Sequence, residues 1–182
     1  MILKIVKYPD PVLKKMSAPV ARVDRETQQL IEDMFETMYD APGVGLAAPQ
    51  VGVLKRILVI DVGRLEDDSK KPDPMAIVNP VIKTREGKII WEEECLSLPQ
   101  LSVSMERSKK IVVEGLDQNG KTVSLSAEDL LSVAFQHEID HLDGVLLVDR
   151  LSQLKKDLYK KKLAKREKTE DVERGHGPVY VG

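Results

Sequence analysis

One segment decides how the rest of this sequence is interpreted: Gln136-His137-Glu138-Ile139-Asp140-His141-Leu142-Asp143-Gly144. On an α-helix, His137 and His141 lie one turn apart, with Cβ atoms roughly 5–6 Å from each other. Both imidazole rings can then bind one metal ion, while Glu138 projects beside it as a proton carrier. The same pattern also occurs by chance in amphipathic helices whose histidines are exposed or packed. The spacing therefore favours a metal site without establishing it.

The residues around this segment predict that it lies on a helix. An apolar run precedes it, made of Leu130, Leu131, Val133, Ala134 and Phe135. Ser126, followed three residues later by Asp129, is typical of a capping box and predicts the helix start there. Gly144 predicts the end of the helix.

The composition indicates a globular protein of one domain. The chain has 182 residues, of which 42% are hydrophobic and 32% are charged; this is enough to bury a core and too apolar for a disordered chain. A formal net charge of −2 gives no reason to expect DNA or a membrane surface as the main partner. No apolar run approaches the roughly 20 residues that span a bilayer, and residues 1–9 lack the core of a signal peptide. We therefore expect a cytoplasmic protein.

Helix and strand signals follow one another in an order that predicts an α+β fold. Asp24 can cap an amphipathic helix that stops near Asp40. Strand patterns follow at residues 56–62, 76–84, 88–93, 110–116 and 121–126, with a further short one at 145–148. Residues 117–120 are a turn signal that joins two of these strands as a hairpin. Short strands joined by turns, with helices before and after them, favour antiparallel sheets.

A run of small residues that ends in a polar one lies between the first helix and the first strand: Gly43-Val44-Gly45-Leu46-Ala47-Ala48-Pro49-Gln50. Its glycines would let a backbone or ligand approach closely. It lacks the Gly-Lys-Ser/Thr ending of a phosphate loop. Composition alone favours a tight turn over a binding segment.

Cys95 is the only cysteine, so an internal disulfide is excluded. It lies in the segment Trp91-Glu92-Glu93-Glu94-Cys95-Leu96-Ser97-Leu98-Pro99. Its thiolate and two histidines would give three protein ligands and leave one position open, as in catalytic metal sites. A catalytic Cys/His pair is a further alternative, but it gives no role to the second histidine or to Glu138. From spacing alone, a small buried thiol is the favoured interpretation.

Residues 151–168 predict a basic C-terminal helix. Its basic residues are Lys155, Lys156, Lys160, Lys161, Lys162, Lys165, Arg166 and Lys168, against the two acids Asp157 and Glu167. Such a run is usually a solvated helical face, and it could also contact an anionic partner such as RNA. Residues 169–182 are predicted to be a disordered tail, which leaves residues 1–168 as the single folded domain.

Three segments together resemble the signature motifs of peptide deformylase, in the order of that family: residues 43–50, Glu93-Glu94-Cys95-Leu96-Ser97, and residues 136–141. The likeness runs from Tyr8-Pro9-Asp10-Pro11 to about Leu151. It implies antiparallel β-sheets packed around a central metal-binding helix, with an N-terminal helix and a C-terminal helix. It also implies removal of the N-formyl group from the N-terminal methionine of newly synthesised polypeptides, with release of formate.

The resemblance assigns this chemistry to particular residues. Cys95, His137 and His141 would hold one metal ion, with a water in the fourth position. The metal would lower the pKa of that water, and Glu138 would take its proton and later pass it to the departing amine. The side-chain amide of Gln50 and the backbone N–H of Leu96 would stabilise the oxyanion that forms at the formyl carbon.

By similarity, the N-formylmethionyl nascent peptide lies extended beside Gly43–Gly45 and pairs with its backbone. The methionine side chain would enter a pocket lined by Val44, Leu130, Val133, Ala134 and the His137 ring, with Trp91 near its mouth. Glu93 is expected to pair with Arg107 near the site. Glu94 departs from the commonest family motif, which has glycine there, so we expect ordinary main chain at that point and an added acid that could alter peptide preference.

The metal and the partners are also expectations from the resemblance. Two imidazoles and one thiolate suit iron or zinc, and the family is known for a native Fe²⁺ that zinc, nickel or cobalt can replace. We expect Fe²⁺. We also expect a monomer whose basic C-terminal helix docks on the ribosome, as it does in some bacterial relatives.

Three other classes of protein share parts of this pattern. A zinc endopeptidase would use His137, Glu138 and His141, but it would take a carboxylate or a third histidine as its last ligand. A metal-stabilised module without activity would need a fourth protein ligand. A ribosome-binding relative with a dead site would release no formate.

Overall fold

The computed structural model describes residues 1–63 and 71–173. The chain divides into two compact units, residues 1–146 and residues 147–182. None of the described helices is both long and apolar enough to cross a membrane.

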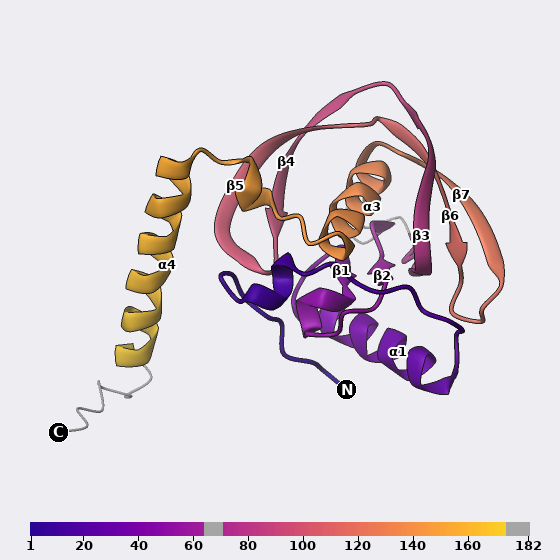
Figure 1. The fold of residues 1–182 in the computed structure, drawn as a ribbon, viewed down its shortest axis with the longest axis horizontal. Helices are drawn as coiled ribbons and strands as arrows, with labels where there is room; N and C mark the ends of the chain where they lie inside the picture. Colours follow the sequence, from indigo (N-terminus) through magenta and orange to yellow (C-terminus); the bar gives the residue numbers. More distant parts are fainter. Residues whose placement is uncertain (64–70, 174–182) are drawn as a thin grey trace. The chain divides into compact units, whose positions relative to one another are not determined.

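The first unit is built on a five-stranded antiparallel sheet (Figure 1). Its strands, in spatial order, are β1 (Gly45–Ala47), β2 (Ile57–Ile60), β3 (Met75–Glu86), β6 (Lys110–Leu116) and β7 (Thr122–Glu128). All four side chains of β2 are buried, because core clusters cover both faces of the sheet. Leu58 and Ile60 belong to one cluster, and Ile57 and Val59 belong to the other. The corresponding predicted strands are confirmed.

Helix α1 (Arg25–Asp40) contributes to the cluster of Ile57 and Val59 through Met34 and Met38. The Asp24 carboxylate accepts a hydrogen bond from the backbone N–H of Thr27 at 2.9 Å, which caps the helix as the sequence predicts. Two 3₁₀ turns complete this part of the fold, η1 (Pro11–Lys14) and η2 (Ala48–Val51).

A separate antiparallel hairpin, β4 (Ile89–Cys95) and β5 (Leu98–Arg107), lies on the far side of helix α3 (Asp129–Leu142). Figure 1 shows α3 enclosed by β4 and β5 on one side and by β3, β6 and β7 on the other. Phe135, Ile139 and Leu142 pack into the cluster that contains Leu58 and Ile60. The predicted α+β fold, with antiparallel sheets around a central helix, is confirmed.

The start of α3 differs from the prediction. Strand β7 continues to Glu128, and Ser126 pairs with Val112 within it. Ser126 is therefore a strand residue, and the predicted capping box is wrong. The chain turns directly from strand to helix at Asp129, whose φ is 51°.

The end of α3 is as predicted. Gly144 has a φ of 71°, and a Cβ atom there would stand 2.5 Å from the carbonyl oxygen of Lys14. Both the backbone conformation and the available space require glycine at this position.

The second unit starts with a 3₁₀ turn, η3 (Leu147–Arg150). The strand predicted at 145–148 is wrong, because a short apolar run does not distinguish a strand from a helical turn. The predicted basic helix is α4 (Gln153–Glu173), which continues beyond 168. Residues 174–182 lie outside the described part of the chain, so their disorder stays a prediction.

Candidate metal centre

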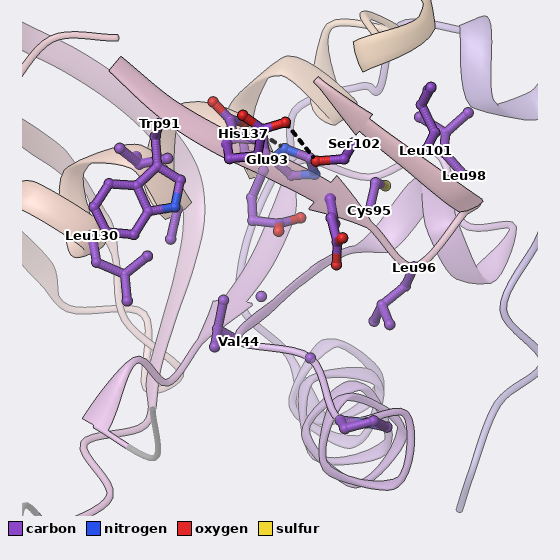
Figure 2. A pocket seen from close by; sticks show the side chains of 18 of the residues that line it. Val44, Trp91, Glu93, Cys95, Leu96, Leu98, Leu101, Ser102, Leu130 and His137 are labelled. Carbon is purple, nitrogen blue, oxygen red and sulfur yellow. Dashed lines mark hydrogen bonds and ion pairs between the residues drawn. The ribbon is translucent and has the colours of Figure 1, made fainter. Parts of the chain in front are cut away.

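Three side-chain donors, from Cys95, His137 and His141, converge between α3 and the β4–β5 hairpin. Figure 2 shows two of these residues, Cys95 and His137, which line a cavity. His141 Nε2 lies 3.3 Å from Cys95 Sγ and 3.2 Å from His137 Nε2, and all three donor atoms lie within 4.8 Å of one another. Two nitrogens bound to one tetrahedral ion at about 2.0–2.1 Å lie about 3.3 Å apart, and a sulfur at about 2.3 Å lies about 3.5 Å from each nitrogen. The two separations measured from His141 Nε2 match this geometry, so the three residues fit a bound metal ion.

The hairpin places Cys95 opposite the two histidines. The β4–β5 register shifts between Glu94 and Cys95, and Cys95 pairs with Leu98 at the end of the hairpin. The thiol is buried, as spacing alone predicts, yet it faces two imidazole nitrogens. Glu94 has no positive φ, so the expectation of ordinary main chain there is confirmed.

Glu93 orients the His137 ring through a contact with its Nδ1 atom. Its Oε1 lies 3.0 Å from His137 Nδ1, and Arg107 donates to both carboxylate oxygens at 2.8 and 2.9 Å. Burial raises the pKa of Glu93, but the hydrogen bonds from His137 and Arg107 outweigh it and hold that pKa below its usual value. An ionised Glu93 accepts a hydrogen bond from His137 Nδ1–H, which leaves Nε2 as the atom of the ring that can bind a metal once it gives up its proton. The predicted pairing of Glu93 with Arg107 is confirmed.

Asp140 is a member of this network that the sequence analysis missed. Arg107 also donates to Asp140 Oδ2 at 2.7 Å, which ties the hairpin to α3. The signal was available, because Asp140 follows His137 by three residues and so lies on the same face of the helix.

The two histidines differ in their affinity for protons. Burial lowers the pKa of His137, but its contacts with Cys95 and Glu93 outweigh burial and raise that pKa well above its usual value. Burial and the charge of His137 lower the pKa of His141 well below its usual value. In the metal-free chain, His141 is therefore the neutral ring, and a metal must displace the proton of His137.

Glu138 lies beside the three donors and is buried from solvent. Its side chain is 5% exposed, and Oε2 has no hydrogen-bond partner among the residues that the structure describes. Burial is the main cause that raises its pKa, to about 7. A carboxyl group of this kind can both take and release a proton near neutral pH.

Gln50 is held in one orientation by the short turn η2. Its Oε1 accepts a hydrogen bond from the backbone N–H of Ala47 at 2.9 Å. The amide nitrogen must then point the other way, toward Ser97 Oγ at 3.2 Å and Cys95 Sγ at 3.6 Å. Gln50 therefore presents N–H donors to the metal centre.

A cavity of about 900 Å³ opens onto this centre. Its lining includes every residue predicted to bind substrate, namely Val44, Gly45, Trp91, Glu93, Leu130, Val133 and Ala134. Leu96, Gln50 and Glu138 line it as well. Figure 2 shows Val44 and Leu130 on the side of the cavity away from Leu98 and Leu101. Leu98, Gln100 and Leu101 also line the cavity and were not predicted, because only the hairpin register brings β5 to this wall.

Comparison with known proteins decides which family this centre belongs to. The family model of polypeptide deformylase matches residues 2–157. The chain belongs to this family. A peptide deformylase of Thermodesulfovibrio yellowstonii is 49% identical over 88% of this chain and 96% of the relative. Crystal structures of the deformylases of Legionella pneumophila and Ehrlichia chaffeensis are 44% and 40% identical, with TM-scores of 0.84 and 0.87, and the matches cover 93% of this chain and 98% and 99% of theirs.

The donor set also argues against a zinc endopeptidase and against a structural metal module. The third donor is the thiol of Cys95, where a zinc endopeptidase would have a carboxylate or a third histidine. Among the described residues, the donor group holds three members, whereas a structural metal module would have four.

Proposed function

We propose that this protein is a metal-dependent hydrolase that removes the N-formyl group from the N-terminal methionine of newly synthesised polypeptides and releases formate. Its membership of the deformylase family supports this activity. The single observation that carries the proposal is the convergence of Cys95, His137 and His141 beside Glu138. The buried Oε2 of Glu138 has no hydrogen-bond partner among the described residues, and Glu138 lines one cavity together with Cys95 and His137.

We propose that Glu138 carries the proton during hydrolysis. A divalent metal held by Cys95, His137 and His141 would supply a Lewis acid and a water of lowered pKa. Glu138 would accept the proton of the attacking water and then deliver it to the amine that leaves the formyl carbon. Its pKa of about 7 in the metal-free chain suits both steps, and the cavity beside it admits the substrate.

Gln50 and Leu96 are the proposed donors to the oxyanion. The hydrogen bond from Ala47 to Gln50 Oε1 fixes the side-chain amide before substrate arrives, so no reorganisation is needed in the transition state. The N–H of Leu96 follows Cys95 directly in the chain. Loss of one donor of this kind typically costs about 10²–10³ in rate.

The free edges of two strands suit an extended peptide. β1 is the first strand of the five-stranded sheet, and β4 pairs with β5 alone among the described strands. Residues of both strands line the cavity, so a peptide can add to the sheet edge there. We propose that the methionine side chain enters between Val44 and Leu130, and that Val133, Ala134 and Trp91 complete its pocket.

We propose Fe²⁺ as the native ion, with Zn²⁺, Ni²⁺ or Co²⁺ as substitutes. The donor set of one thiolate and two imidazoles suits iron or zinc. Protein purified without oxygen should contain iron and lose formate-releasing activity in air, and Ni²⁺ or Co²⁺ should restore it. Zinc in freshly purified anaerobic protein, with full activity, would contradict this assignment.

We further propose that α4 docks this monomeric, cytoplasmic enzyme on the ribosome. The lysines of α4 are nearly all exposed, as an electrostatic contact with RNA requires. In this proposal residues 1–168 act as one catalytic domain, and the predicted tail begins only after α4 ends at Glu173. Replacing Lys160, Lys161 and Lys162 by glutamate should weaken ribosome co-sedimentation while activity on short peptides persists; undiminished co-sedimentation would contradict the docking role.

Matched substrates test the proposed reaction. The metal-loaded protein should release formate from a formyl-methionyl tripeptide and should leave the internal bonds of the unformylated tripeptide intact. Cleavage of internal bonds would instead support an endopeptidase. Ribosome binding without formate release would support a relative with a dead site.

A further inference from the structure

Glu92, Glu93 and Glu94 are consecutive on β4, and all three line the cavity. Two of them have partners. Glu92 accepts a hydrogen bond from the hydroxyl of Ser102 at 2.9 Å, and Glu93 is bound by Arg107. The side chain of Glu94 is exposed, and it forms no hydrogen bond or ion pair with the residues that the structure describes. Its charge is therefore available to a ligand.

Three basic side chains of this region, those of Lys88, Arg107 and Lys7, already have partners. Lys88 pairs with Glu106 at 3.0 Å, and Arg107 pairs with Glu93 and Asp140. Lys7 donates to the carbonyl oxygen of Leu96 but does not line the cavity.

The cavity lining contains no lysine or arginine among the described residues. The exposed acids Glu92, Glu94 and Asp129 thus give this part of the wall a negative potential that no lysine or arginine among the described lining residues offsets.

The position of Glu94 relates this charge to the substrate path. Glu94 directly precedes Cys95 in the chain. The buried Oε2 atom of Glu138 has no hydrogen-bond partner among the described residues, and Glu138 lines the same cavity, so a polar group of a ligand can be bound there. An extended peptide advances about 3.3 Å per residue. A peptide whose formyl group reaches Cys95 has its methionine next along the strand, and the side chains of its second and third residues then follow near the Glu94 carboxylate.

We propose that Glu94 is a specificity-determining residue that favours formyl-methionyl peptides with lysine or arginine at the second or third position. This inference rests on the proposed function. Glycine, which the family resemblance leads one to expect at this position, would have neither the charge nor the reach to discriminate.

Paired peptides test this proposal on the full metal-loaded chain. Formyl-Met-Lys-Ala-amide is compared with formyl-Met-Glu-Ala-amide, and formyl-Met-Ala-Lys-amide with formyl-Met-Ala-Glu-amide. At low salt, kcat/KM should favour the lysine peptide of at least one pair by about three- to tenfold, because attraction of one charge and repulsion of the other combine. Added salt at about 0.5 M should reduce the ratio.

Two variants separate a local effect from a general one. Glu94→Gln should bring the lysine-to-glutamate ratio close to one. Glu32→Gln removes the same charge from an exposed position on α1 that does not line the cavity, and it should keep the wild-type ratio. Inhibition by the deformylated peptides Met-Lys-Ala-amide and Met-Ala-Lys-amide should weaken in Glu94→Gln, which gives a readout of binding alone.

A wild-type ratio of one in both pairs, or an unchanged ratio in Glu94→Gln, would overturn the role of Glu94 and leave formate release intact. Failure of the metal-loaded chain to release formate from any of the four peptides would overturn the proposed function itself, and this inference with it.

Discussion

Glu138 packs so closely against Gly45 that a Cβ atom at position 45 would stand 2.4 Å from its carboxylate oxygen Oε1. Glycine at this position of β1 is therefore what lets Glu138, the proposed proton carrier, lie beside the proposed metal ligands. The contact links the first motif of the sequence to the third, and it explains a glycine that composition alone assigns to a simple turn.

Gly45→Ala should displace the carboxylate of Glu138 and lower kcat by about 10- to 100-fold, because a shift of about 1 Å in a catalytic group has effects of this size. Metal content and the thermal midpoint, measured beside kcat, show whether the site is otherwise intact. Wild-type kcat in a folded, metal-loaded Gly45→Ala protein would mean that the close approach is not needed.

Glu93→Gln should weaken metal binding by about 10- to 100-fold, since partners of this kind orient the ligand histidine and raise its basicity. Competition with a chelator measures the affinity. Glu106→Gln on the neighbouring strand β5, whose carboxylate pairs with Lys88, is the matched control and should bind metal like the wild type. A metal affinity in Glu93→Gln equal to that of the wild type would show that Glu93 does not orient His137 for metal binding.

Gln50→Ala should lower kcat by about 10²–10³ with little change in KM, because the lost donor acts mainly on the developing oxyanion. The amide that this variant removes is the one that the Ala47 N–H orients through a hydrogen bond to Oε1 at 2.9 Å. An equal rise in KM at constant kcat would indicate that Gln50 binds the ground state instead.

The stability of the metal-free chain should depend on pH through Glu138. Burial raises its pKa from 4.5 to about 7, so its contribution is complete below the unfolded-state pKa and is lost as pH rises through about 7. The loss amounts to about 3 kcal/mol in the free energy of unfolding. Urea unfolding at several pH values should show this decline in the metal-free wild type and a smaller one in Glu138→Gln. Parallel curves for the two proteins would contradict a raised pKa.

The sequence predicts the metal-binding helix well, because the i, i+4 spacing of His137 and His141 is a local property of an α-helix. Cys95 is different. It meets His141 across 46 residues, and only the resemblance to a family, not its spacing, predicts that meeting. Local signals also failed at Ser126, where strand pairing with Val112 prevailed over a capping pattern. Likewise, the β5 wall of the cavity depends on the register of a hairpin, which no short pattern encodes.

Glu138 is proposed to carry the proton in a metal-dependent deformylation. The most direct test is formate release from a formyl-methionyl tripeptide by anaerobically prepared wild type and Glu138→Gln at equal metal content. We expect rapid release by the wild type and a rate at least about 10²–10⁴ lower in the variant. Equal rates in the two proteins, with metal confirmed in both, would show that Glu138 does not carry the proton.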